Sequence, residues 1–211
     1  MDFKQWEPIY EEILRDFGWE RKKDEDAAQY LSKLLQVTDY DLEVLREKID
    51  GKNILVCGNS SSLSSDLEKI DFKNYVIIAA DGATSTLMEK GIVPDIIVTD
   101  LDGYLPDEIE ANRKGALIVV HAHGDNIDKL FIVKKLKNVI GTTQSAPLHN
   151  VYNFGGISDG DRCVFLAHTF SAKSITLAGF YFEDKNVTEI KKKKLKWARK
   201  LIGMIPGIES G

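Results

Sequence analysis

The chain has 211 residues, 28 of them Lys or Arg and 33 Asp or Glu, and its hydrophobic content of 43% is that of an ordinary globular protein. This length suits one domain with an extension. No apolar run approaches the roughly 18 residues of a membrane span, and residues 1–4 lack the layout of a signal peptide, so we expect a cytoplasmic protein that spans no membrane.

Residues 1–50 carry the apolar periodicity of helices. Apolar side chains recur at three- and four-residue steps before Gly18, again around Leu31, and once more from Leu42 to Ile49, where Thr38 is the predicted helix cap. Such a helical extension packs its apolar stripe against the main domain or against a second copy of the chain, in which case the protein would be a homo-oligomer.

From residue 51 onward, short β-branched runs alternate with helical stretches. Five buried strands are predicted, at 53–57, 75–79, 95–99, 116–120 and 174–178. Five helices are predicted between them, at 63–70, 84–90, 106–113, 126–137 and 161–170. This order predicts an α/β catalytic domain over residues 51–211, with a doubly wound, mostly parallel sheet covered on both faces. Cys57 and Cys163 lie in apolar stretches without CxxC spacing, which predicts two core residues instead of a disulfide or a zinc site.

Charge is unevenly distributed along the chain. Residues 81–128 carry 10 acidic and 3 basic side chains, whereas residues 129–211 carry 6 acidic and 14 basic ones. Many of the basic residues lie in 191–200, where Ile190, Trp197 and Leu201 form an apolar stripe, so we expect the solvated face of a terminal helix. The net charge of −5 also argues against a dedicated nucleic-acid-binding protein.

Polar residues follow four consecutive predicted strands at the point where each strand ends. The first strand is followed by the loop 58–62, and the others by acidic and histidine side chains, namely Asp81, Asp100, Asp102, His121, His123, Asp125 and Asp128. The carboxyl ends of parallel strands share one edge of a sheet, and ligands of open α/β sheets bind beyond that edge. We therefore expect these side chains to surround one ligand.

The crowding of these carboxylates predicts a bound cation, because like charges repel one another unless a cation lies among them. Mg²⁺ is typically held by one or two carboxylates together with substrate phosphates. In an extended stretch the side chains of Asp100 and Asp102 point the same way, so both can face one ion, and Gly103 then lets the chain turn away. The sequence therefore predicts a magnesium site.

The loop 58–62 predicts a phosphate-binding site. Gly58 and Asn59 are followed by Ser60 and Ser61 at the expected start of a helix, where backbone N–H groups and hydroxyls can face an anion. The loop is neither G-x-G-x-x-G nor a Walker motif, which argues against a dinucleotide fold and the usual P-loop. The alternative is that Asn59 or Ser60 is an ordinary helix cap.

A second Gly-rich segment, 154–162, precedes an apolar helical run. Asp159, Asp161 and Arg162 offer hydrogen-bond acceptors and a guanidinium at one turn, which suits recognition of a polar ring or a phosphate. A capped helix with a surface ion pair is the alternative.

The run His121-x-His123-x-Asp125 raises the competing hypothesis of a zinc-type hydrolase. It resembles the metal-binding run of metallo-β-lactamase-like hydrolases. That family has a further histidine where Asn126 stands and needs more histidines downstream than this chain offers. We therefore expect His121 or His123 to contact a phosphate or an acceptor molecule.

Taken together, these motifs resemble those of a known family. The Asp81-Gly-Ala run, the 94–103 run and the Asp125-x-x-Asp128 run resemble the catalytic domain of thiamin pyrophosphokinases. With Gly58-Asn59, the His-Ala-His-Gly-Asp run and the segment 155–162 added, the set is more similar to the archaeal 6-hydroxymethyl-7,8-dihydropterin pyrophosphokinases. The resemblance covers roughly residues 51–180.

The resemblance implies Mg²⁺-dependent transfer of the β,γ-diphosphate of ATP to the hydroxymethyl group of a pterin, with release of AMP. The implied magnesium ligands are Asp100, Asp102 and Asp128. Either Asp81 or Asp125 would assist proton removal from the acceptor, and the sequence does not choose between them. The residues expected to bind the nucleotide phosphates are Gly58, Asn59, Ser60, Ser61 and His123. Those expected to bind the pterin are His121, Asp159, Asp161 and Arg162.

Three alternatives stay open. Thiamin pyrophosphokinase is the nearest of them, although the thiamin enzymes have Ser where Gly103 stands and usually carry a C-terminal β domain. A non-catalytic Mg-nucleotide-binding module would bind Mg-ATP without forming AMP. A related domain of sugar-transfer systems would be expected beside a second large domain. The phosphate loop also departs from many relatives, which have Gly-x-Gly-Pro-Ser where this chain has Gly58-Asn-Ser-Ser-Ser.

Overall fold

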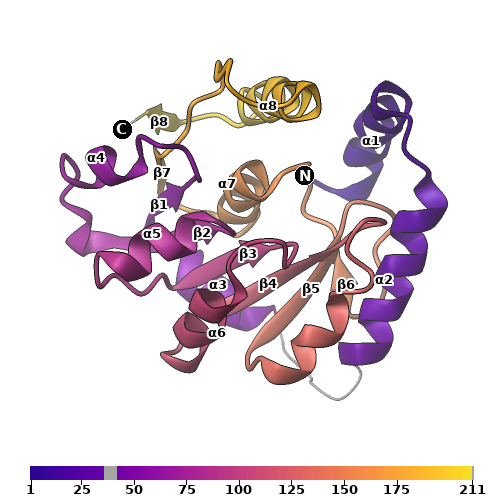
Figure 1. Cartoon of the computed structure of the whole chain (residues 1–211), viewed down its shortest axis with the longest axis horizontal. Helices are drawn as coiled ribbons and strands as arrows, with labels where there is room; N and C mark the ends of the chain where they lie inside the picture. Colours follow the sequence, from indigo (N-terminus) through magenta and orange to yellow (C-terminus); the bar gives the residue numbers. More distant parts are fainter. Residues whose placement is uncertain (36–41, 211) are drawn as a thin grey trace.

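In the computed structural model, which describes residues 1–35 and 42–210, a single eight-stranded sheet runs through the molecule (Figure 1). Its strands are β1 (Asn53–Cys57), β2 (Tyr75–Ala80), β3 (Ile96–Thr99), β4 (Leu117–Ala122), β5 (Val139–Thr143), β6 (Val151–Tyr152), β7 (Ser174–Ala178) and β8 (Ile208–Ser210). Their order is β6-β5-β4-β3-β2-β1-β7-β8, and every neighbouring pair is parallel. The predicted cap Thr38 lies outside the described residues.

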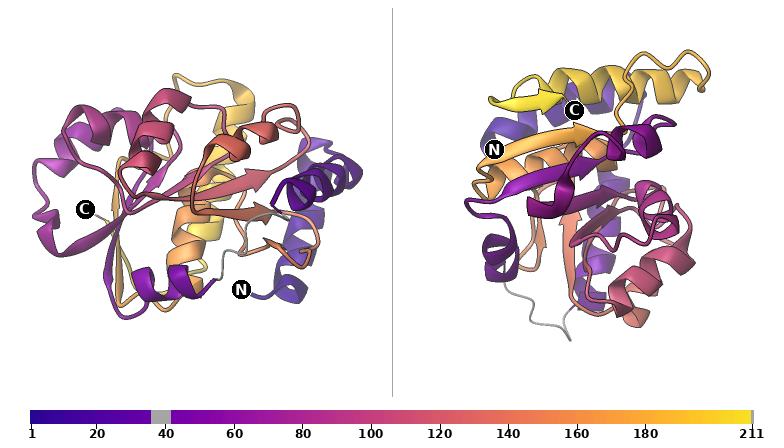
Figure 2. Two further views of the ribbon diagram at one scale, coloured as in Figure 1. Left: turned by 90° about the horizontal axis from the view of Figure 1, so that it is seen from below. Right: turned by 90° about the vertical axis from the view of Figure 1, so that its left-hand side faces the viewer.

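Helices cover both faces of this sheet, as the further views in Figure 2 show. The helices are α1 (Phe3–Phe17), α2 (Arg21–Leu35), α3 (Glu43–Ile49), α4 (Leu63–Leu67), α5 (Ala83–Glu89), α6 (Leu105–Arg113), α7 (Asp159–Thr169) and α8 (Glu189–Ile202), with short 3₁₀ turns η1 (Phe72–Asn74) and η2 (Leu130–Lys135). The predicted doubly wound α/β fold is confirmed. No helix in the described part of the chain is long and apolar enough to cross a bilayer.

Alternate residues along each strand pack into two separate cores, one on each face of the sheet. Ile54 and Val56 of β1 pack in one core with α1, α3, α7 and α8, whereas Leu55 and Cys57 pack in the other with α2, α4, α5 and α6. The period of two along a strand explains this division. Both cysteines are buried, as predicted. The N-terminal helices contribute to both cores, so they are packed on the sheet directly.

The structure differs from the sequence prediction between residues 126 and 137. An α-helix was expected there, but the described structure has only the 3₁₀ turn η2. The Asn126 side chain explains the difference, because its Nδ2 donates to the backbone oxygens of Asp100 and His121, both at 2.7 Å, and its Oδ1 accepts from the His123 N–H at 3.0 Å. These bonds hold the chain in a turn where the helix was expected to begin.

Three strands were absent from the prediction. β6 and β8 have only two and three residues, and β5 is interrupted by Gly141. A Cβ atom at Gly141 would lie 2.6 Å from the Leu35 Cδ1 atom and 3.1 Å from the Leu31 Cδ2 atom of α2. Glycine therefore lets α2 approach the sheet closely, and it also removes the β-branched residue that would have signalled a strand.

The first and last long helices contact each other. Trp197 Nε1 of α8 donates to the Asp16 carboxylate at 2.7 Å, and Lys193 Nζ pairs with the same carboxylate at 2.9 Å. Trp197 and Leu201 are buried, which confirms the predicted terminal helix, whereas Ile190 is exposed and does not belong to its apolar stripe.

We predict that Leu31→Ala lowers the free energy of unfolding by about 2–5 kcal/mol, because Leu31 is fully buried between α2 and β5 and its loss leaves a cavity. Tyr30→Ala is the matched control, since the neighbouring Tyr30 is exposed, and it should change stability by less than about 0.5 kcal/mol. Urea denaturation measures both. Equal effects of the two substitutions would show that α2 is not anchored through Leu31.

Candidate active site

A cavity of about 490 Å³ opens beyond the carboxyl ends of the strands, a volume within the usual range for small-molecule sites. The loops after β1, β2, β3, β4 and β7 line it, together with the start of α7, the link between α1 and α2, and one face of α8. The chain reverses its direction across the sheet between β1 and β7, and ligands of open α/β sheets bind at such a switch point.

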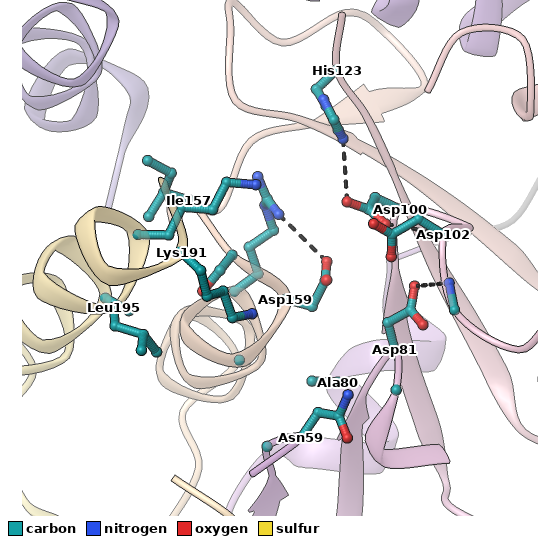
Figure 3. A pocket seen from close by; sticks show the side chains of 18 of the residues that line it. Asn59, Ala80, Asp81, Asp100, Asp102, His123, Ile157, Asp159, Lys191 and Leu195 are labelled. Carbon is teal, nitrogen blue, oxygen red and sulfur yellow. Dashed lines mark hydrogen bonds and ion pairs between the residues drawn. The ribbon is translucent and has the colours of Figure 1, made fainter. Parts of the chain in front are cut away.

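Three carboxylates meet on one wall of this cavity (Figure 3). Oxygen atoms of Asp81, Asp100 and Asp102 all lie within 4.8 Å of one another. The sequence predicted that the last two would face one ion because they lie on an extended stretch. This reason is wrong, since β3 ends at Thr99 and the intervening Leu101 has a left-handed φ of 66°. A tight turn, in which the Asp102 N–H donates to Asp100 Oδ1 at 3.2 Å, brings the carboxylates together.

The protonation of this acidic group is uneven. Burial disfavours the charged form of Asp100, but its hydrogen bonds with His123 and Asp102 outweigh burial and lower its pKa. His123 Nε2 lies 3.2 Å from Asp100 Oδ2. Burial and the neighbouring Asp100 and Asp81 raise the pKa of Asp102 to about 6. The group thus contains one strongly ionised carboxylate and one that gives up its proton just below neutral pH.

Glu108 of α6 lies behind Asp81, and no sequence pattern points to it. Thr99 Oγ1 lies 2.9 Å from Asp81 Oδ2 and 3.1 Å from Glu108 Oε1. Burial and the charge of Asp81 raise the pKa of Glu108 to about 9. A single hydroxyl hydrogen cannot serve two carboxylates fully. A protonated Glu108 resolves this, because it donates to Thr99 and leaves the Thr99 hydrogen for Asp81.

Gly103 is required by the close approach of Asp81. Its N–H donates to Asp81 Oδ2 at 3.2 Å, and a Cβ atom at this position would lie 1.6 Å from Asp81 Oδ1. Any larger residue would displace the carboxylate. At Gly82 a Cβ atom would lie 2.1 Å from Nδ2 at the end of the exposed Asn59 side chain, so a larger residue there would shift Asn59.

The predicted phosphate loop is only partly directed at the cavity. Gly58, Asn59 and Ser60 line it, whereas Ser61 is exposed and lies outside the lining. The Ser60 hydroxyl lies 2.8 Å from the Ser62 hydroxyl, which donates to Asp66 Oδ2 at 2.8 Å. These bonds fix the loop after β1. Asp66 also accepts the Gly179 N–H at 3.0 Å, so it joins the loops on the two sides of the switch point.

The start of α7 contributes Asp159 and Arg162 to the lining. The Arg162 guanidinium donates to Gln144 Oε1 at 3.0 Å and lies 3.4 Å from Asp159 Oδ1. Asp161 is fully buried and does not line the cavity. Its carboxylate accepts the backbone N–H groups of Ile157 at 2.6 Å and Ser158 at 2.9 Å, so it caps the helix, which was the alternative reading of this segment.

The residues of the loop 121–125, here called the histidine loop, do not all face the cavity. His123 and Asp125 line the cavity, whereas His121 is buried behind it with its Nδ1 3.2 Å from Thr142 Oγ1. Burial and the nearby Arg162 lower the pKa of His121, so this ring is neutral. Asp128 is exposed and lies outside both the acidic group and the cavity lining. The ligand contacts predicted for His121, Asp128, Ser61 and Asp161 are therefore not matched by their positions.

The N-terminal helices complete the site through Asp24, a buried residue that the sequence did not single out. Its Oδ1 accepts the Gly124 N–H at 2.9 Å, and its Oδ2 accepts from Tyr10 at 2.6 Å and from Gln144 Nε2 at 2.8 Å. Gln144 in turn holds Arg162. One carboxylate of α2 therefore positions both the histidine loop and the arginine of α7.

Glu108→Gln is expected to stabilise the protein at alkaline pH. Because the pKa of Glu108 is raised in the folded state, its contribution to stability is complete below its ordinary pKa of 4.5 and is lost as the pH rises through about 9. Glutamine keeps the neutral form, so the variant should exceed the wild type by about 1–3 kcal/mol at pH 8 and by much less at pH 5. Urea denaturation in the presence of EDTA, at pH 5 and at pH 8, measures the free energy of unfolding of the wild type and of the variant.

The control for this experiment is Glu110→Gln on the same helix, a partly exposed residue 3.5 Å from Lys114. It should show little difference between the two pH values. A gain in Glu108→Gln that does not depend on pH would contradict the proton assignment.

Comparison with known proteins places the chain among a group of related enzymes. Residues 28–187 match the family described as 6-hydroxymethylpterin diphosphokinase MptE-like. The chain is 42% identical to 6-hydroxymethyl-7,8-dihydropterin pyrophosphokinase of Methanocaldococcus jannaschii, over 97% of this chain and 96% of that protein. It is 44% identical to the protein of the same name from Pyrococcus furiosus, over 96% and 93%. The corresponding Methanothermobacter thermautotrophicus protein is 41% identical, over 87% and 80%.

Proposed function

Because the chain belongs to the MptE-like family of 6-hydroxymethylpterin diphosphokinases, we propose that it transfers the β,γ-diphosphate of ATP to the hydroxymethyl group of 6-hydroxymethyl-7,8-dihydropterin. The observation that carries this proposal is the acidic group of Asp81, Asp100 and Asp102 on the wall of a cavity large enough for small substrates. We also propose that the reaction takes place in the cytoplasm, where ATP is available.

The acidic group fits a magnesium ion. Its three carboxylates offer only oxygen atoms, which Mg²⁺ prefers, and Mg²⁺ usually keeps room for waters and phosphate oxygens. Asp81, Asp100 and Asp102 would hold the ion, which when bound neutralises charge on the phosphate oxygens. Asp128, which the family resemblance suggested as a ligand, is exposed and outside this group, so we leave it out of the ligand set.

The transfer step moves a diphosphate and one proton. The acceptor hydroxyl oxygen forms a bond to the β-phosphorus, the bond from the β-phosphorus to the α,β-bridging oxygen breaks, and AMP leaves with that oxygen. Catalysis of such a step depends on positioning and on charge stabilisation. Asp81 is committed to the acidic group, so we assign the hydroxyl proton to Asp125, which lines the cavity outside that group.

Gly103 supports a pterin acceptor over thiamine. The thiamin enzymes have Ser at the corresponding position, and here a side chain would collide with Asp81 Oδ1. The acidic group of this chain is therefore built around a glycine, and a thiamin-type serine would require a different position of that carboxylate.

The proposal is tested by incubating the purified protein with ATP, Mg²⁺ and either 6-hydroxymethyl-7,8-dihydropterin or thiamine, and measuring AMP. We expect AMP and the pterin diphosphate in the first mixture only. AMP formation only in the mixture with thiamine would show that the acceptor is thiamine and not the pterin. Binding of Mg-ATP without AMP in either mixture would identify a nucleotide-binding module.

Replacing both Asp100 and Asp102 by Asn is expected to lower the rate of AMP formation by about 100-fold or more, because neutral amides bind Mg²⁺ weakly and no longer stabilise charge at the phosphates. Asp107→Asn is the matched control. This residue lies on α6 and outside the cavity lining, so its substitution should leave the rate unchanged. A folded double variant with near-normal turnover would remove these two residues from the metal site.

A further inference from the structure

The lysines of α8 divide into two groups with different surroundings. Lys191 and Lys194, together with Leu195 and Ala198, line the cavity. Lys192, Lys193 and Lys196 line a shallow surface on the other side of the same helix. In Figure 3, Lys191 and Leu195 lie across the cavity from Asp100 and Asp102, and the Lys191 side chain points into the space between the two walls.

The two groups also differ in their partners. Lys192 pairs with Glu189 at 2.7 Å, and Lys193 pairs with Asp16 at 2.9 Å. Among the ion pairs formed by the described residues, neither Lys191 nor Lys194 takes part in one. Lys194 Nζ instead lies 5.6 Å from the centre of the Trp19 ring, a contact that holds it beside the link between α1 and α2. The two inner lysines thus bring positive charge to the cavity that no carboxylate of the described protein neutralises.

The acidic group and the inner lysines come from different elements of the cavity lining, which also contains other charged side chains, namely Glu20, Lys23, Asp24, Asp125, Asp159, Arg162 and Asp184. Asp81, Asp100 and Asp102 follow the central strands. Lys191 of α8 lies across the cavity from Asp100 and Asp102 in Figure 3, and Lys194 lines the same cavity from α8. A polyanion that carries a divalent cation matches this arrangement, because the cation contacts the acidic wall and the remaining negative oxygens contact the ammonium groups. A neutral ring carries no negative charge to match the two lysines.

We propose that Lys191 and Lys194 form a subsite for the polyphosphate of the nucleotide, opposite the acidic group. This inference rests on the proposed function, and it adds a binding role for a helix that lies outside the matched family segment 28–187. Lysine ammonium groups are mobile point charges on long stems, which suits them to a phosphate chain whose oxygens change position when the diphosphate is transferred.

The test compares lysines from the two faces of α8. Binding of tripolyphosphate and of Mg-α,β-methylene-ATP, which cannot transfer its diphosphate, is measured by calorimetry for the wild type, for Lys191→Gln and for the Lys191→Gln/Lys194→Gln double variant. Lys196→Gln is the matched control, because it removes the same charge from the outer face.

We expect the affinity for both ligands to fall about tenfold in Lys191→Gln, and further in the double variant, as befits loss of charge-assisted bonds to phosphate. Lys196→Gln should bind both ligands nearly as the wild type does. Equal losses in Lys191→Gln and Lys196→Gln would mean that only overall charge matters and would overturn the subsite. Unchanged affinity in the double variant would overturn it as well.

These outcomes are distinct from failure of the proposed function. If the wild type forms no AMP with any acceptor but binds tripolyphosphate through Lys191, the subsite stands and the transfer reaction fails. If the double variant forms AMP with an unchanged KM for ATP, the transfer reaction stands and the subsite fails.

Discussion

Mutual repulsion among Asp81, Asp100 and Asp102 is the constraint to which the surrounding structure responds. Carboxylate oxygens within 4.8 Å of one another are costly to ionise together in a partly buried wall. The protein offsets this cost with hydrogen bonds from the Asp102 and Gly103 N–H groups and with the His123 ring. Burial and the charge of Asp81 raise the pKa of the neighbouring Glu108, which disfavours a fourth negative charge there. These contacts hold the three carboxylates with oxygen atoms close enough together to face one cation.

The parallel sheet supplies these carboxylates, but the helices at its margins supply the rest of the cavity. The family match begins at residue 28 and ends at residue 187, so Asp24 and the lysines of α8 lie outside it. Asp24 nevertheless fixes the histidine loop and, through Gln144, the Arg162 guanidinium. The N-terminal helices therefore have a positioning role in the site in addition to their role in the core.

The central part of the fold is predictable from the sequence because strands buried on both faces need β-branched runs, and β1, β2, β3, β4 and β7 have them. β5 is not predicted because its central residue, Gly141, is not β-branched. This glycine lets α2 approach the sheet, and such a tertiary requirement leaves no local pattern in the sequence. Within the site, the meeting of Asp81 and Asp100 follows from parallel strand ends, whereas Asp102 joins them through the turn at Leu101, which the sequence does not reveal. The capping role of Asp161 and the burial of His121 depend on contacts made by α7 and β5. Periodicity likewise identifies α8 as a helix without showing which of its lysines face the cavity.

The contact between α1 and α8 has a consequence for the order in which the molecule assembles. The bonds that join them, from Lys193 and Trp197 to Asp16 and from Lys200 to Glu12, link residues 177 to 188 positions apart. Contacts across such long segments form slowly, because closing the loop costs chain entropy before any interaction offsets it. On the ribosome, strands β1 to β7 are available for pairing before residues 189–202 emerge. The residues of the acidic wall, which follow β2 and β3, are thus available for pairing before those of the opposing cationic wall on α8.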